Sequence, residues 1–336
     1  MAEGVTYTVD HGLAQYALRR VIQIPPLLLG ISILSFAIFY LSPVDPVIAY
    51  LGLTTVQKMS PEDLAKVEEQ LGLGQPVHIR YMLWLEKIVH GDWGYSHIKK
   101  RPVLEAILER FPATILLTIT GYGLSAIISI FLGLVSASKA GSKLDRVLNG
   151  INYLIYSIPT FLVALVAMFL FSLWLGWLPS SRMVSVDTPT TTWPLILDVA
   201  RHLILPATVL ALSHMAVFYA YIRSSVLEVL KENYILTARA KGLEERSVII
   251  RHAFRNALLP FITQVGILIP FLIGGSVVVE SVFAWPGIGL LAYEAALRAD
   301  YMLLMGLTLF SSVLVIFGNL AADIAYAIVD PRIKYS

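Results

Sequence analysis

The sequence predicts an all-α integral membrane protein with six membrane-spanning helices. Of its 336 residues, 57% are hydrophobic and only 14% are charged, and the mean hydropathy is +0.73. Soluble globular domains carry about 25% charged residues, so this composition indicates a chain that lies largely in lipid. Long runs without a charged residue also recur along the sequence, and about 20 apolar residues suffice to cross a bilayer.

Six uncharged runs reach the required length, and each is expected to form one transmembrane helix. They are Val21–Val44, Phe111–Ser138, Val147–Ser181, His202–Ile222, Asn256–Val279 and Tyr301–Ala322. The third run has 35 residues, so its ends must include interface or loop. We therefore expect a first span at residues 21–42, a long connecting segment at residues 43–110 and a core of five spans at residues 111–322.

The first run is expected to be a retained helix and not a removable signal peptide. Arg19 and Arg20 precede it, but its 24 residues exceed the apolar part of a signal peptide, and no small-residue cleavage site follows. Because six is an even number of spans, the terminal segments, residues 1–20 and 323–336, are expected on the same side of the membrane.

The distribution of Lys and Arg predicts which side that is, because short cytoplasmic loops are enriched in both. One set of segments holds 14 basic residues: residues 1–20, 139–146, 223–255 and 323–336. The short loops on the opposite side hold three: Arg182, Arg201 and Arg298. Long loops count little in this rule, so the segment at residues 43–110 is set aside. Both termini and the 223–255 loop are therefore expected in the cytoplasm.

The segment at residues 43–110 is then external and is expected to contain short helices. Ser60-Pro61-Glu62-Asp63 is typical of a helix start, and Gly72 is expected to end that helix. Four aromatic residues follow: Tyr81, Trp84, Trp93 and Tyr95. Two hypotheses stay open, a small cap lying on the membrane interface, where Trp and Tyr prefer to sit, or a docking surface for an external partner.

The sequence contains no motif that would let this chain power transport by itself. The phosphate-binding motif G-x-x-x-x-G-K-[ST] is absent, as are H-E-x-x-H and G-x-S-x-G. The centres of the spans contain no Asp, Glu, Lys or Arg, which usually carry the coupling ion in ion-driven transporters. His214 has no acidic partner in its span, so it is expected to pack or hydrogen-bond between helices.

Other function classes are excluded by composition. The chain has no Cys, which excludes disulfides, thiolate metal sites and thiol catalysis. Its formal net charge of +2 gives no basic balance that would indicate nucleic acid as a partner. We expect no cofactor and no metal in this chain, and we expect it not to be an enzyme.

The most informative segment is the charged excursion from Glu232 to Pro260, which is too long for a simple connector and belongs to the loop predicted at residues 226–258. Good helix formers run on from the fourth span to Lys241, Gly242 is expected to end that helix, and a second helix is expected over Glu244–Leu258. One hypothesis is an amphipathic hairpin lying on anionic lipid. The other is a rigid lever inserted into a groove of a cytoplasmic partner, where the small residues Ala238, Ala240 and Gly242 permit close approach.

Several motifs in their order along the chain resemble the permease subunits of prokaryotic ABC importers for dipeptides, oligopeptides and nickel. The resemblance covers nearly all of residues 15–334. Its marks are SPVDP (42–46), GDWGYS (91–96), RFPAT (110–114), HLILPA (202–207), RSSVLEVLKENYILTARAKGL (223–243), RHAFRNALLP (251–260), ESVFAWPGIG (280–289), ADY (299–301) and DPRIK (330–334).

The resemblance implies a type I ABC importer permease fold in the cytoplasmic membrane of a prokaryotic cell. It implies a second homologous permease subunit completing the pore, two ATP-binding cassette subunits that bind ATP and Mg²⁺, and an extracytoplasmic solute-binding protein. Six residues fall at the positions through which the family couples to its ATPases: Ala238, Arg239, Ala240, Lys241, Gly242 and Leu243.

The resemblance also indicates an external gate after the fifth run. The residues that match are Glu280, Trp285, Pro286, Gly287 and Gly289. Pro and Gly there are expected to break the helix and shape the outer end of the pore. A plain helix-ending turn is the alternative.

The expected function is therefore ATP-driven, binding-protein-dependent import, with short peptides as the favoured substrate. Oligosaccharides and nickel are alternative cargoes of the same importer type, and an autonomous secondary transporter or channel is the alternative of a different class. Polar residues that either line a pore or bond between helices are Thr118, Thr120, Ser125, Ser129, Tyr153, Tyr156, Ser157 and Gln264.

Overall fold

The computed structural model describes residues 4–41, 45–70, 73–187, 191–258, 261 and 276–329. The chain divides into two compact units, one made of Met1–Thr114 with Gly287–Ser336 and the other of Ile115–Pro286. The long helix α6 (Val103–Ser138) runs from the first unit into the second. Within the described ranges the secondary structure is helical apart from one short antiparallel pair, so the predicted all-α class is confirmed.

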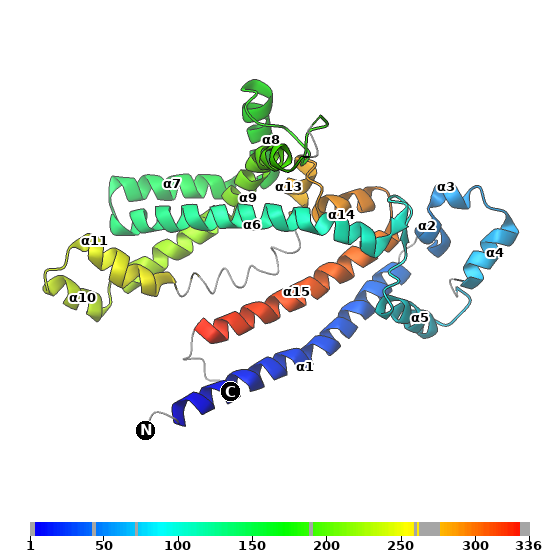
Figure 1. Cartoon of the computed structure of the whole chain (residues 1–336), viewed down its shortest axis with the longest axis horizontal. Coiled ribbons are helices and arrows are strands. Elements are labelled where there is room, and N and C mark those ends of the chain that lie inside the picture. Colours follow the sequence, from blue (N-terminus) through cyan, green and yellow to red (C-terminus); the bar gives the residue numbers. More distant parts are fainter. Residues whose placement is uncertain are drawn as a thin grey trace. The chain divides into compact units, whose positions relative to one another are not determined.

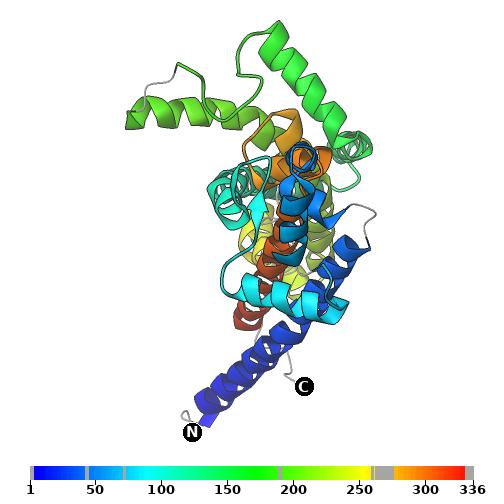
Figure 2. The ribbon, with the colours of Figure 1, turned by 90° about the vertical axis from the view of Figure 1, so that its right-hand side faces the viewer.

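Two long helices run antiparallel in the first unit. The N-terminal end of α1 (Gly4–Tyr40) and the C-terminal end of α15 (Tyr301–Val329) lie at the same end of this unit, as two views show (Figures 1 and 2). This arrangement is the one expected if the two ends of the chain share one side of a membrane.

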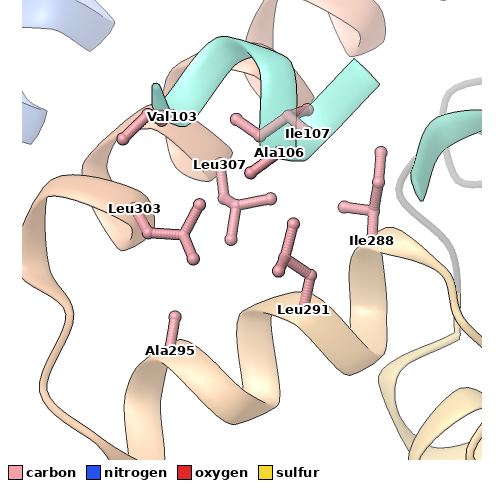
Figure 3. Packing of buried hydrophobic residues seen from close by; sticks show 8 residues of the cluster. All are labelled: Val103, Ala106, Ile107, Ile288, Leu291, Ala295, Leu303 and Leu307. Atoms are coloured by element: carbon pink, nitrogen blue, oxygen red, sulfur yellow. The ribbon is translucent and has the colours of Figure 1, made fainter. Parts of the chain in front are cut away.

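The core of the first unit joins the first turns of α6, the start of α15 and α14 (Ile288–Leu297) (Figure 3). Its buried members point toward one another from these three helices: Val103, Ala106, Ile107, Ile288, Leu291, Ala295, Leu303 and Leu307. The Oγ1 of Thr114 accepts a hydrogen bond from the backbone N–H of Ile288 over 2.7 Å. The segments RFPAT and WPGIG, far apart in sequence, are thereby held together.

The segment at residues 43–110, which is predicted to be external, contains the short helices that the sequence predicts. These are α2 (Pro46–Leu51), α3 (Leu53–Val56), α4 (Pro61–Gln70) and α5 (Val77–Val89). Ser60 caps α4, because its Oγ accepts a hydrogen bond from the N–H of Asp63 over 3.2 Å. Gly72, the expected end of this helix, lies outside the described residues.

Three of the four aromatic residues that the sequence analysis singled out in this segment pack inside the first unit. Tyr81 and Trp84 lie 5.5 and 5.6 Å from Phe36 of α1, measured between ring centroids. Trp93 lies 6.4 Å from Phe310 of α15. These contacts explain the aromatic residues as internal packing, and the two hypotheses for the outer surface of the segment stay predictions.

A buried carboxylate ties the hairpin β1 (Tyr95–Ser96) and β2 (Arg101–Pro102) to the start of α15. Asp300 is fully buried and accepts hydrogen bonds from the Ser96 hydroxyl and from the backbone N–H groups of Ile98 and Leu303. The end of the segment GDWGYS and the segment ADY therefore contact one another through the Asp300 carboxylate.

The second unit contains the rest of α6 together with α7 (Lys143–Ser157), α8 (Thr160–Met168), the π-helical η1 (Phe169–Trp174) and α9 (Thr192–Val229). Next come α10 (Asn233–Ala240), α11 (Glu245–Ser247), the π-helical η2 (Val248–Ala253) and α13 (Val277–Val282). Buried Phe218 and Ile222 of α9 pack with Ala137 of α6 and with Ala257 and Phe261.

The structure confirms part of the predicted set of spans. Among the described residues, three helical segments are long and apolar enough to cross a membrane: Val103–Ser138, Thr192–Val229 and Tyr301–Ala322. The third predicted run is bent by 97° between Lys143–Ser157 and Thr160–Trp174, which pass the test only as a pair. The first run contains the shorter apolar stretch Val21–Ala37, and most of the fifth run lies outside the described residues, so the count of six stays a prediction.

Two helices begin before the spans predicted within them, because a charge-free run marks the apolar part of a helix and not its ends. The helix α6 begins at Val103 and not at Phe111, since Glu105 and Glu109 belong to its first turns. The helix α9 begins at Thr192 and not at His202, and it includes the charged residues Asp198 and Arg201.

Candidate functional site

The candidate site is the excursion between α9 and the fifth predicted run, here called the ARAKG loop and defined as residues 230–258. The helix α9 extends past Arg223 to Val229, as expected, but it does not continue to Lys241. Backbone in an extended conformation at Glu232 interrupts it, and α10 begins at Asn233. The break turns Ile235 into the interior of the loop, so tertiary packing here overrides a favourable helix propensity.

Gly242 forms the corner of the loop, as the sequence predicts. Its φ is +76°, in the left-handed region, and its N–H donates to the carbonyl oxygen of Arg239 over 2.9 Å. The N–H of Leu243 points to the carbonyl oxygen of Ala238 at 3.4 Å. This pair of bonds is the Schellman arrangement that closes a helix on a glycine.

The expected second helix is present and is irregular. It begins at Glu245, becomes π-helical at Val248–Ala253 and continues to Leu258. π-Helical turns are rare and occur frequently at functional sites. Val248 and Ala253 point into the loop, whereas Ile250 is 50% exposed.

The loop has a small core of its own. Ile235, Ala238, Val248 and Ala253 are buried together and pack against Val229 and Leu230 at the end of α9. Ala238 therefore belongs to the interior of the loop and does not offer its methyl group to a partner. The loop is a compact knob whose position is linked to the last turn of α9.

An ion pair crosses the corner. The Arg239 guanidinium donates from Nε and Nη2 to the two carboxylate oxygens of Glu245, over 3.0 and 2.6 Å. These hydrogen bonds hold the pKa of the Glu245 carboxyl below its ordinary value and raise the pKa of Arg239. The side chains of Arg239 and Glu245 are 38% and 55% exposed, so the pair orients the corner more than it stabilises the fold.

Five of the six predicted coupling residues are exposed: Arg239, Ala240, Lys241, Gly242 and Leu243. A Cβ atom added at Gly242 would meet no other heavy atom within 4 Å. Leu243, next to the glycine, is 43% exposed, and Leu236 of α10 is 52% exposed, so the loop carries exposed apolar side chains. Small residues at the corner would let another protein come close to the backbone, and apolar and cationic side chains lie next to them in the loop. Such a surface suits docking against another protein.

The residues of the predicted gate lie where α13 ends and α14 begins. Glu280 and Trp285 are fully buried, and the N–H of Trp285 donates to the carbonyl oxygen of Glu280 over 2.9 Å. Gly287 caps α14, and Gly289 is buried in its first turn. Helix breaking around Pro286 is confirmed, and the role of these residues as a gate stays a proposal.

The polar residues of the spans mostly bond between or along helices. His214 is confirmed as an interhelical partner, since its Nε2 lies 3.0 Å from the hydroxyl of Tyr122 on α6. Ser129 donates to the carbonyl oxygen of Met215 on α9 over 3.1 Å, while Tyr153 and Tyr156 are exposed. Gln264 lies outside the described residues.

Sequence reasoning missed a buried ion pair at the base of the loop. Arg223 binds Asp145 at the start of α7 with two hydrogen bonds of 2.9 Å. Two features of the sequence could have drawn attention to these residues. Asp145 is the one acidic residue in the basic segment 139–146, and Arg223 is the first residue of the motif RSSVLEVLKENYILTARAKGL. Nothing in the sequence joins these two positions, which are 78 residues apart.

Comparison with known proteins shows which family this chain is related to. The family model described as "Binding-protein-dependent transport system inner membrane component" matches residues 129–335, and the model of its N-terminal part matches residues 13–118. The oligopeptide transport system permease protein AppB of Bacillus subtilis is 44% identical over 96% of this chain and 100% of its own length. The dipeptide transport system permease protein DppB of Alkalihalophilus pseudofirmus is 36% identical over 95% and 99%.

A solved structure shares the fold. A chain of the MetNI methionine ABC transporter in an inward-facing conformation matches with a TM-score of 0.52 and 17% sequence identity. The match covers 68% of this chain and 97% of that chain. This likeness concerns the fold alone, and it agrees with the fold class predicted from the sequence.

Proposed function

This chain belongs to the family of binding-protein-dependent transport system inner membrane components, and from that premise we propose that it is a peptide-importing permease subunit driven by separate ATPases. The observation that carries the proposal is similarity over the full length to permeases of oligopeptide and dipeptide transport systems. The compact ARAKG loop supports the proposal, since a permease driven by separate ATPases needs a surface to which they attach.

The loop is the proposed contact with the ATPase. Ala240, Gly242 and Leu243 would enter a groove of the ATPase, where the absence of a side chain at the corner permits close approach of the two backbones. Arg239 and Glu245 would keep the corner in its docking shape. Ala238 and the other buried residues of the loop make the knob stiff enough to pass on a displacement.

The proposed transport cycle is alternating access. Closure of two ATPases on ATP would draw both docked loops together, tilt the attached spans and open the pore toward the external binding protein. Hydrolysis would return the spans to the inward-open state. The pore would be shared with a second, homologous permease subunit, and ATP and Mg²⁺ would be held by the ATPases.

The proposed orientation places the ARAKG loop and both termini in the cytoplasm of a prokaryotic cell. It is supported by the excess of Lys and Arg on that side and by the shared end of α1 and α15 in the first unit. The residues around Glu280, Trp285, Pro286, Gly287 and Gly289 would then lie toward the external side, and we propose that they shape the outer gate.

Short peptides are the proposed cargo because the relatives with the names quoted above belong to peptide transport systems. The binding protein would select the peptide. The test is to tag this chain, purify it gently from its native membrane and identify what accompanies it. We expect a second permease, ATPase subunits and a binding protein whose ligands are peptides. Recovery of this chain alone, active in vesicles without ATP, would overturn the proposal.

A further inference from the structure

A buried charge cluster joins three helices of the second unit at the base of the ARAKG loop. Asp145 of α7 is only 3% exposed, and Arg223 of α9 grips it through Nε and Nη2, each at 2.9 Å from a different carboxylate oxygen. This two-point geometry fixes the orientation of the guanidinium as well as its distance.

Further donors complete the coordination of the Asp145 carboxylate. Its oxygens also accept from the hydroxyl of Ser136 on α6, the backbone N–H of Gly141 and the side-chain amide of Asn149. Ser136 also lies 2.7 Å from the hydroxyl of Tyr219 on α9. The carboxylate is therefore a junction between the end of α6, the start of α7 and α9.

The packing behind the junction leaves little freedom between α6 and α9. Small residues recur on α6 at every fourth position and are buried: Gly121, Ser125, Ser129, Gly133 and Ala137. A Cβ atom added at Gly133 would lie 2.6 Å from Cγ2 of Ile222, and one added at Gly121 would lie 2.8 Å from Cδ2 of Leu210. The glycines thus let the Ile222 and Leu210 side chains of α9 lie directly against the backbone of α6, the close approach that small residues permit between membrane helices.

Two further side chains fix the register of α9 along its length. Ser129 of α6 donates to the carbonyl oxygen of Met215, and Asn152 of α7 donates to that of Ala216 over 3.3 Å. Apolar contacts alone let helices slide in a membrane, since lipid tails are as apolar as leucine. Polar bonds of this kind oppose sliding because each has only one register.

The position of the junction gives it a role in coupling. Arg223 stands six residues before Val229, the last residue of α9, and the core of the ARAKG loop packs on that last turn. At 1.5 Å per residue, Arg223 lies about 9 Å along the axis of α9 from Val229. A force applied to the loop reaches this junction before it reaches the apolar part of α9.

We propose that the Asp145–Arg223 pair is a positioning device that fastens the base of the ARAKG loop to α6 and α7, so that a displacement of the loop moves three helices together. The inference rests on the proposed function, because it assigns these residues to the coupling between hydrolysis and transport. Without the pair, α9 would turn or tilt alone, and ATP would be hydrolysed with less transport.

The test measures the amount of solute transported per ATP hydrolysed by the full complex in proteoliposomes. Asp145→Asn and Arg223→Gln should each lower this ratio by about 10-fold, a typical coupling between sites, while hydrolysis and assembly persist. The double variant should be no worse than either single variant, since the two residues act as one pair. Arg146→Gln, an exposed neighbour of Asp145, is the matched control and should leave the ratio unchanged.

Milder variants keep the inference testable if these changes prevent folding. Arg223→Lys keeps the charge but loses the two-point grip, and Ser136→Ala removes one donor and leaves the pair intact. Both should lower the ratio by less than the variants above. An unchanged ratio in these assembled variants, or uptake and hydrolysis that fall in proportion, would overturn the inference. Absence of ATP-dependent uptake by the unaltered complex would instead overturn the proposed function.

Discussion

Gly242 donates its backbone N–H to the carbonyl oxygen of Arg239 from a left-handed conformation, and Arg239 in turn binds Glu245 on the other side of the corner. The glycine thus lets the chain reverse, and the ion pair aligns the two helices that meet there. The space beyond Gly242 contains no other atom of the described chain within 4 Å. The corner is therefore open at Gly242, as the proposed docking to an ATPase requires.

The substitution Gly242→Arg should separate ATP hydrolysis from transport. A side chain in the left-handed region costs about 1–2 kcal/mol, and the long cation would also block close approach to the ATPase. We expect uptake to fall at least about 10-fold with hydrolysis retained, measured on the reconstituted complex. Gly242→Asn is the matched variant, since Asn tolerates this conformation, and it should retain more uptake. Normal uptake by Gly242→Arg would contradict the assignment of the corner.

The substitution Leu243→Asp should weaken retention of the ATPase without unfolding the chain. Leu243 is 43% exposed beside the corner, so the change loses little internal packing but places a carboxylate in the proposed interface. The amount of ATPase that co-purifies with the tagged chain should fall. Leu297→Asp, at a residue that is 68% exposed on α14, is the control and should retain the ATPase. Equal retention by both variants would exclude Leu243 from the interface.

The corner should loosen only in acid. Its ion pair keeps the pKa of Glu245 below the ordinary value, so the stabilising contribution is complete above the unfolded value of about 4.3 and is lost as pH falls through the lower folded value. Hydrogen exchange at Gly242 and Leu243, corrected for intrinsic rates, should therefore not change between about pH 8 and 6. Protection should fall below about pH 4, and Glu245→Gln should remove this dependence. Loss of protection near neutral pH would show that another group controls the corner.

The substitution Gly133→Leu should destabilise the second unit far more than Gly123→Leu. Even a Cβ atom at position 133 would lie 2.6 Å from Ile222, whereas one at position 123 of the same helix would meet nothing within 4 Å. Overpacking of this kind costs about 1–3 kcal/mol. Thermal unfolding of the detergent-solubilised protein should show a lower Tm for Gly133→Leu only. Equal Tm values would mean that α6 and α9 separate easily.

Local features were predictable from the sequence where neighbouring residues determine them. Ser60 and Pro61 begin a helix as expected, and Gly242 turns the chain as expected, because both effects act over one turn. The fold class followed from composition, since a chain with so few charges must lie in lipid. The length and charge of the excursion between two apolar runs already singled out the ARAKG loop, and the resemblance to permeases then gave its expected role.

Features that depend on distant contacts were not predictable from the residues alone. The break at Glu232 exists because Ile235 packs against Val248 and Ala253, and helix propensity contains no information on that contact. The orientation of Ala238 into the loop follows from the same core. Asp145 and Arg223 each looked like one more charge near a span end, and only the fold brings them together.

The most direct test of the central claim is uptake of a short peptide into proteoliposomes that contain the complete complex. The binding protein with its peptide is supplied outside and ATP inside, and a complex assembled without the ATPase subunits serves as the control. The account predicts accumulation of peptide that requires ATP, the binding protein and the ATPase. Equal uptake without ATP and without the ATPase would contradict it and would establish this chain as an autonomous transporter.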